Sequence, residues 1–140
     1  MDTNYDPSGK WDEGIGEILQ KVDIFLPNAV ECQGIASTDS LEQALKYLQK
    51  KVKYLGVKLG EDGAILCHNT QKYEVKPIRV KVVDTVGAGD SFDAGFIYGY
   101  LAGWEPERML KLASICGSLS TRQAGGTAAQ PTIEEAMRYL

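Results

Sequence analysis

The chain has few cysteines and almost no histidine. Its three cysteines, Cys32, Cys67 and Cys116, are odd in number and widely spaced, and they form no Cys-x-x-Cys pair. This pattern argues against a disulfide framework or a zinc site and predicts buried thiols in a reducing compartment. The single histidine, His68, has no second histidine with which to share a metal ion. We therefore expect a cytoplasmic protein without a histidine–cysteine metal centre.

Long apolar runs and basic clusters are also missing. No stretch approaches the length of a membrane-spanning helix, and no charged and then apolar leader precedes a cleavage-site pattern. The formal net charge is −4 with acids and bases interspersed, so we expect neither a nucleic-acid nor a membrane partner. The 140 residues are 44% hydrophobic and 24% charged, which suits one globular domain with a core.

Hydrophobic periodicity predicts alternating strands and helices. Short apolar or alternating stretches predict strands at 23–26, 54–59, 64–68, 72–76 and 78–83. Apolar residues at helical spacing predict helices at 11–21, 41–52, 90–101, 106–122 and 132–139, the second beginning at an Asp39–Glu42 capping pair. Strands that alternate with helices of this length indicate an α/β layered fold with a mostly parallel sheet.

A glycine-rich turn followed by a helix lies at residues 83–96, Val-Asp-Thr-Val-Gly-Ala-Gly-Asp-Ser-Phe-Asp-Ala-Gly-Phe. The first N–H groups of a helix lack intrahelical partners and lie at the positive end of its dipole, so such a turn suits an anion. Asp90 would place a carboxylate beside that anion. This combination suits phosphoryl transfer to an alcohol, because the alcohol must lose a proton while negative charge develops next to it.

Other interpretations of this turn differ in strength. Asp90 also fits a simple helix cap, since a carboxylate near a helix start is favourable by about 0.3–1 kcal/mol, and the turn alone favours neither role. A dinucleotide-binding turn fits less well, because Phe92 stands where the third glycine should be and Asp90 would repel a pyrophosphate. A Walker loop is excluded, because the chain has no Gly-Lys-Ser/Thr.

Residues Asp84–Phe96 closely resemble the signature of the ribokinase-like (PfkB) carbohydrate kinases, Asp-Thr-x-Gly-Ala-Gly-Asp followed by a helix of small and aromatic residues. The resemblance implies a three-layer αβα Rossmann-like fold, with ATP and Mg²⁺ as cofactors and a sugar as the acceptor. It implies that Asp90 is the general base. The residues implied to hold the transferring phosphoryl group are Gly87, Ala88, Gly89 and Asp90, with Thr85 at the nucleotide.

Further segments match family features in the expected order. Asn28-Ala-Val-Glu31 resembles the Asn-x-x-Glu motif, which implies that Glu31 holds Mg²⁺ through water, although a helix start with an exposed Glu31 also fits. Lys58-Leu-Gly60-Glu-Asp-Gly63 resembles a strand-end turn beside the nucleotide, although a plain turn needs both glycines for its backbone. The helix implied to flank the adenine contributes Ser114, which replaces the family's usual Asn or His, and Gly117. Some relatives bind a monovalent cation such as K⁺, for which the matching groups are Asp84 and the Val86 carbonyl.

The resemblance covers residues 1–140 but only the C-terminal, nucleotide-binding half of the family's kinase domain. The N-terminal half, which supplies the first strands, the lid and most sugar contacts, is expected to be absent. We therefore expect ATP-dependent phosphorylation of a sugar hydroxyl by a chain that is incomplete alone and forms a homo-oligomer or pairs with the missing half. The alternatives are a non-catalytic nucleotide-binding or subunit-interaction module and an NAD-dependent dehydrogenase.

Overall fold

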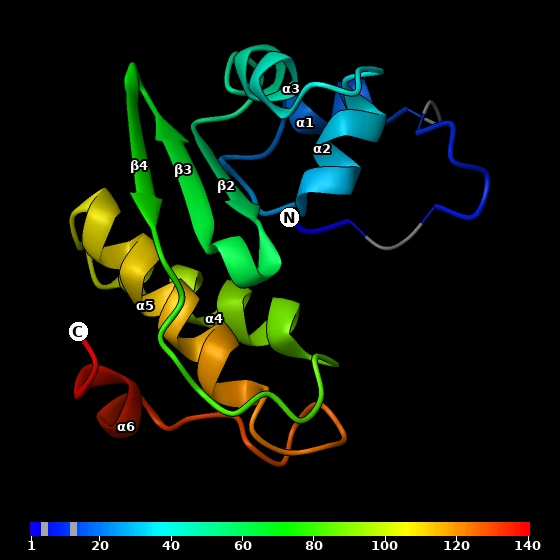
Figure 1. Cartoon of the computed structure of the whole chain (residues 1–140). Coiled ribbons are helices and arrows are strands. Elements are labelled where there is room, and N and C mark those ends of the chain that lie inside the picture. Colours follow the sequence, from blue (N-terminus) through cyan, green and yellow to red (C-terminus); the bar gives the residue numbers. More distant parts are fainter. Residues whose placement is uncertain (4–5, 12–13) are drawn as a thin grey trace. The chain divides into compact units, whose positions relative to one another are not determined.

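The computed structural model describes residues 1–3, 6–11 and 14–140 of the chain (Figure 1). The helices are α1 (Ile15–Leu19), α2 (Ala29–Ile35), α3 (Leu41–Leu48), α4 (Ala88–Leu101), α5 (Pro106–Ser120) and α6 (Ile133–Met137). The strands are β1 (Ile24–Phe25), β2 (Tyr54–Lys58), β3 (Ala64–His68) and β4 (Gln71–Val75), and a 3-10 turn, η1, spans Gly60–Asp62.

The four strands form one sheet in the order β1-β2-β3-β4. β1 and β2 are parallel, with Ile24 paired to Tyr54 and Phe25 to Leu55, and the chain between them contains α2 and α3. β2, β3 and β4 follow one another through short turns, and turns of that length join antiparallel strands because a parallel pair needs a longer crossover. The predicted α/β class is confirmed, whereas the sheet is mixed rather than mostly parallel.

The described chain divides into two compact units. The first contains Met1–Leu59 and Ile65–Lys72, and the second contains Gly60–Ala64 and Tyr73–Leu140. The core of the first unit is built from buried apolar side chains of its helices and strands, among them Leu19, Phe25, Leu45, Leu48, Leu55 and Val57. In the second unit, Leu112, Ile115 and Leu119 of α5 pack with Ala136 of α6, and Ile78 and Val80 lie against them.

Several predicted elements have different ends. The helix predicted at 11–21 is shortened to α1, and residues 12–13 of that range lie outside the described residues. Trp11 is not helical, because its φ is +53° and its side chain lies against Gly34 of α2. α3 is capped by Ser40, whose side chain accepts a hydrogen bond from the Gln43 N–H, and not by the predicted Asp39–Glu42 pair.

The segment 78–83 is irregular, although its alternating residues predict a strand. Ile78 and Val80 face the α5–α6 cluster, while Val82 and Val83 are more than half exposed. Alternation thus marks which side chains of this segment pack inward, but a strand also requires a neighbouring backbone to pair with.

Glycines allow α4 and α5 of the second unit to approach closely. A Cβ added at Gly95 would lie 3.0 Å from the Ala113 Cα, and one added at Gly117 would lie 3.2 Å from the Ala88 carbonyl oxygen. The first turn of α4 therefore rests directly against α5. This contact fixes the position of the helix start that the sequence predicts to bind phosphate.

The cysteines behave as small buried side chains. Cys32 and Cys67 are buried, Cys116 is partly buried, and all three are free thiols. Burial raises the pKa of Cys32 to about 12 and that of Cys116 to about 11. Over the described residues, no three His, Cys, Asp or Glu side chains form a metal-binding group, and no helix has the length and apolar character needed to cross a bilayer.

Candidate active site

The N-terminus of α4 is open toward an incoming anion. Gly87 is the N-cap, in the left-handed conformation with φ +75°, and no side chain caps the helix. The first intrahelical bond runs from the Ser91 N–H to the Gly87 carbonyl at 3.0 Å. The N–H groups of Gly89 and Asp90 precede it and therefore have no carbonyl partner within the helix. These two amides, at the positive end of the helix dipole, are suited to bind negatively charged oxygens.

One of the four residues predicted to hold the phosphoryl group, Ala88, already uses its backbone N–H in a hydrogen bond. The Ala88 N–H donates to the Thr85 carbonyl at 3.2 Å, which closes the turn before α4. A phosphoryl group would compete with that carbonyl for the Ala88 N–H, whereas the next two amides need no rearrangement.

Asp90 is the third residue of α4, and it is exposed. The interpretation of Asp90 as the helix cap loses support, because Gly87 occupies the N-cap and no side chain makes a cap bond there. The Asp90 carboxylate therefore lies in the first turn, next to the open amides, where it is accessible from solvent.

The carboxylate of Asp84 accepts two backbone hydrogen bonds just before this turn. Oδ1 accepts from the Val86 N–H and Oδ2 from the Gly125 N–H, both at 3.0 Å. These bonds, the one from Gly125 foremost, lower the pKa of Asp84 below its usual value of 3.8, so the side chain stays ionised near neutral pH. Each oxygen retains a lone pair, which is compatible with the predicted monovalent cation contact.

In the first unit, three predicted residues come together at the end of β2. Asn28 and Glu31 form a capping box at the start of α2: the Asn28 side chain accepts from the Glu31 N–H at 2.9 Å, and Glu31 Oε2 accepts from the Asn28 N–H at 2.8 Å. A parallel bridge pairs Asn28 with Lys58, and the Lys58 ammonium forms a 3.0 Å ion pair with Asp2. Glu31 is 8% exposed, so the alternative of an exposed Glu31 does not hold.

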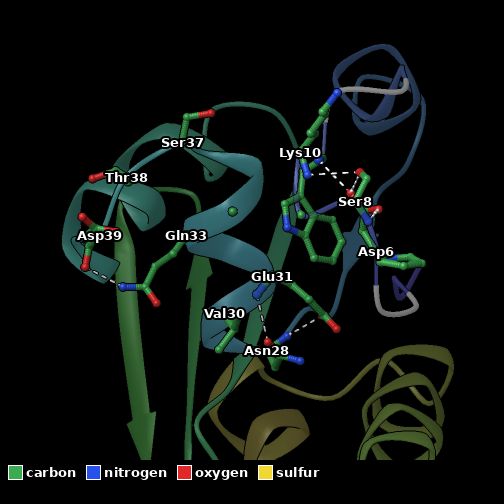
Figure 2. A pocket seen from close by; sticks show the side chains of 14 residues that line it. Asp6, Ser8, Lys10, Asn28, Val30, Glu31, Gln33, Ser37, Thr38 and Asp39 are labelled. Carbon is green, nitrogen blue, oxygen red and sulfur yellow. Dashed lines mark hydrogen bonds between the residues drawn. The ribbon is translucent and has the colours of Figure 1, made fainter.

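A pocket of about 690 Å³ lies beside this capping box (Figure 2). Figure 2 shows Asn28 and Glu31 at the start of α2, with Asp6, Ser8 and Lys10 on the neighbouring segment. Asp6 accepts hydrogen bonds from the N–H groups of Ser8 and Trp11, and the bond from Trp11 is the main cause of its lowered pKa. Polar side chains such as Asp6, Asn28 and Glu31 line the pocket together with the apolar Trp11 and Val30.

The remaining predicted residues have evident structural roles. Gly60 has φ +60°, and Gly63 has φ +98° and a backbone so close to the Val75 carbonyl that no Cβ would fit. Ser114 is 7% exposed within α5, and Gly117 packs against the first turn of α4. The plain-turn interpretation of the two turn glycines is thus sufficient for their backbone, and a nucleotide contact at these four residues stays a prediction.

The structure adds residues that the sequence analysis missed. Asp2 pairs with Lys58, Gly125 binds Asp84, and the Thr121 carbonyl accepts from the N–H groups of Val83 and Asp84 at 2.8 and 3.1 Å. These partners are far apart in sequence, so no local pattern pairs them.

The family of the chain follows from comparison with known proteins. Residues 1–133 match the family model "pfkB family carbohydrate kinase". The chain belongs to this family.

Individual relatives agree with that assignment. An "uncharacterized sugar kinase" of Archaeoglobus fulgidus is 35% identical over 132 residues, which cover 91% of this chain and 53% of the relative. An ATP-dependent 6-phosphofructokinase of Thermoanaerobacterium thermosaccharolyticum is 31% identical over 140 residues, covering 93% and 44%. The structure of Arabidopsis thaliana ribokinase complexed with ribose and ATP has a TM-score of 0.81 and 30% identity, covering 88% of this chain and 42% of that one. The chain thus spans about half the length of these relatives.

Proposed function

We propose that residues 1–140 are the C-terminal, nucleotide-binding half of a ribokinase-like kinase domain that transfers a phosphoryl group from ATP to a sugar hydroxyl. The observation that carries the proposal is the uncapped N-terminus of α4, with two open amides and the exposed Asp90 carboxylate in the same helical turn. Family membership supplies the reaction class, and the ribokinase relative was solved with ribose and ATP.

In the proposed mechanism, Asp90 removes the proton from the acceptor hydroxyl as its oxygen attacks the γ-phosphorus and ADP departs. A positioned base of this kind contributes about 10²–10⁴-fold in rate. The N–H groups of Gly89 and Asp90 bind the equatorial phosphoryl oxygens, where charge develops, and the α4 dipole adds to their effect. The Asp90 carboxylate must then face the acceptor and not the phosphate, since like charges repel.

The cofactor contacts are part of the proposal. Mg²⁺ bound with ATP neutralises phosphate charge. The chain's contribution is Glu31, which would reach the ion through water; its Oε2 is committed to the Asn28 N–H. We assign Lys58, Thr85, Ser114 and the turn at Gly60–Gly63 to the nucleotide, and a K⁺ contact to Asp84 and the Val86 carbonyl.

The first test is ligand binding by the chain itself. Equilibrium dialysis should show binding of ATP with Mg²⁺ in preference to NAD. An activity assay should show no sugar phosphorylation by residues 1–140 alone, because these residues do not include the half of the family domain that encloses the sugar and excludes water. Preference for NAD would overturn the proposal in favour of a dehydrogenase. Sugar phosphorylation by the chain alone would overturn the assignment to half a domain.

The second test concerns Asp90. In a chimera with the N-terminal half of the Archaeoglobus relative, Asp90→Asn should retain ATP binding and lower kcat by about 10²–10⁴-fold. Glu107→Gln is the matched control. Glu107 lies in the first turn of α5, so the substitution removes a similar negative charge near a helix N-terminus. Equal kcat in the wild type and Asp90→Asn would show that Asp90 is not the base.

A second candidate function, a subunit-interaction module, is favoured by the outer face of α4. Ile97, Tyr98 and Leu101 are 44%, 46% and 78% exposed on one helical face, opposite the face that packs on α5. Such an apolar face promotes association with another copy of the chain or with the other half of the family domain. The two functions are compatible, because this face lies away from the first turn of α4, which carries Asp90.

A further inference from the structure

We infer that Asp84 is a positioning residue, which holds the phosphate-binding turn against the 121–127 loop before any substrate arrives. The inference rests on the proposed function of that turn. It concerns backbone hydrogen bonds of Asp84 and differs from the predicted cation contact.

The Asp84 carboxylate joins two separate segments of the chain. The Val86 N–H belongs to the turn itself, and the Gly125 N–H belongs to the loop that follows α5, forty-one residues from Asp84. Hydrogen bonds from N–H groups to an ionised carboxylate are about twice as strong as neutral ones. Asp84 thus fixes the turn and the loop relative to each other by two bonds of 3.0 Å.

The backbone around Asp84 also joins the turn to the 121–127 loop. The Thr121 carbonyl, at the end of α5, accepts from the N–H groups of both Val83 and Asp84. The backbone of Gly87 lies so close to the Gly126 carbonyl that a Cβ would collide with it, and a Cβ at Gly126 would lie 3.1 Å from Val86 Cγ1. The two segments are therefore in direct backbone contact on both sides of the Asp84 carboxylate.

This arrangement has a consequence for the open amides. Gly87 is the N-cap of α4, so the direction of the next N–H groups depends on where the turn is held. Donors that are fixed before the reaction need no reorganisation when charge develops, which is the condition under which they stabilise a transition state best. Asp84 would thus act on phosphate binding through the turn and without touching the phosphate.

The test uses amide hydrogen exchange by NMR on the full chain, without ATP. Asp84→Asn keeps the shape of the side chain but has a single acceptor oxygen, so either the Val86 or the Gly125 amide should exchange about tenfold faster or more. Asp84→Ala should accelerate both. The matched control is Glu107→Gln, which also replaces a carboxylate by an amide, at an exposed residue in the first turn of α5. Unchanged exchange at both amides in Asp84→Ala would overturn the inference, as would protection that appears in the wild type only when K⁺ is added.

A second measurement separates the inference from the proposed function. When ATP with Mg²⁺ is titrated into the wild type, the Gly89 and Asp90 amide signals should shift, and Asp84→Asn should weaken that binding about tenfold or more while circular dichroism stays unchanged. Absence of the shifts in the wild type would refute the phosphate site and leave the exchange result standing. Wild-type affinity in Asp84→Asn would refute the positioning role.

Discussion

The close approach of Gly87 and Gly126 leads to a quantitative prediction for Gly87→Ala. Gly87 has φ +75°, a conformation that an alanine adopts only at a penalty of about 1–2 kcal/mol. Its added Cβ would also meet three backbone atoms of Gly126: the carbonyl oxygen, the Cα at 2.9 Å and the carbonyl carbon at 3.0 Å. Backbone atoms cannot rotate away as a flexible side chain can, so one of the two segments must move.

The steric contribution can be separated by a control in the same helix pair. Gly103, just after α4, has φ +69°, and a Cβ added there would have no atom within 4 Å. Gly103→Ala therefore carries only the conformational penalty of about 1–2 kcal/mol. Overpacking adds about 1–3 kcal/mol at Gly87, so we expect Gly87→Ala to lower the free energy of unfolding by about 2–5 kcal/mol in total.

The assay is guanidinium denaturation followed by far-ultraviolet circular dichroism, combined with ATP titration. A loss of this size is a large part of the about 5–15 kcal/mol that stabilises a typical protein, so the shift in midpoint is measurable. Gly87→Ala should also weaken ATP binding, whereas Gly103→Ala should not. Equal destabilisation by the two variants would refute the reasoning, because it would mean that the Gly87–Gly126 contact adds nothing.

Two further predictions concern the second unit. Leu101→Glu should reduce concentration-dependent association in analytical ultracentrifugation, because it places a charge on the exposed apolar face of α4. Val30→Glu, at a site on α2 that is 72% exposed, should not reduce it. Equal effects of the two variants would mean that the α4 face is not an interface. The hydrogen bond from Arg122 lowers the pKa of Glu135 below its usual 4.5, so the stabilisation it gives is present above pH 4.5 and is lost as the pH falls through the folded-state pKa. The difference in unfolding free energy between the wild type and Glu135→Gln should accordingly shrink on acidification, and a difference that does not vary with pH would contradict this.

Local sequence patterns predicted helices and turns well where the residues of one short segment are enough to specify the element. α4 ends at Leu101 and α5 begins at Pro106, the residues at which the predicted helices 90–101 and 106–122 end and begin. The apolar stripe of α3 is buried as predicted at Ala44, Leu45 and Leu48. The irregular segment at 78–83 shows the limit, because alternation cannot reveal whether a partner strand is available.

The site was predictable in the same uneven way. The Gly-Ala-Gly-Asp turn indicated an anion-binding helix start with an acidic residue, and the structure has an uncapped helix with Asp90 in its first turn. The Asn-x-x-Glu segment also indicated a helix start, and α2 begins there, but the capping box between Asn28 and Glu31 and the burial of Glu31 were not predicted. The sequence did not separate a cap from a base at Asp90, since both roles use the same residue type in the same helical turn.

By itself, the sequence determined the family of this protein, its α/β class and the helix start that carries Asp90, because each depends on residues close together in the chain. Only the tertiary structure decided that the backbone of Gly87 meets that of Gly126, and that the Asp84 carboxylate binds the loop at Gly125. Those contacts join residues far apart in sequence, and they form only when α4 and α5 pack close enough for their connecting backbones to meet.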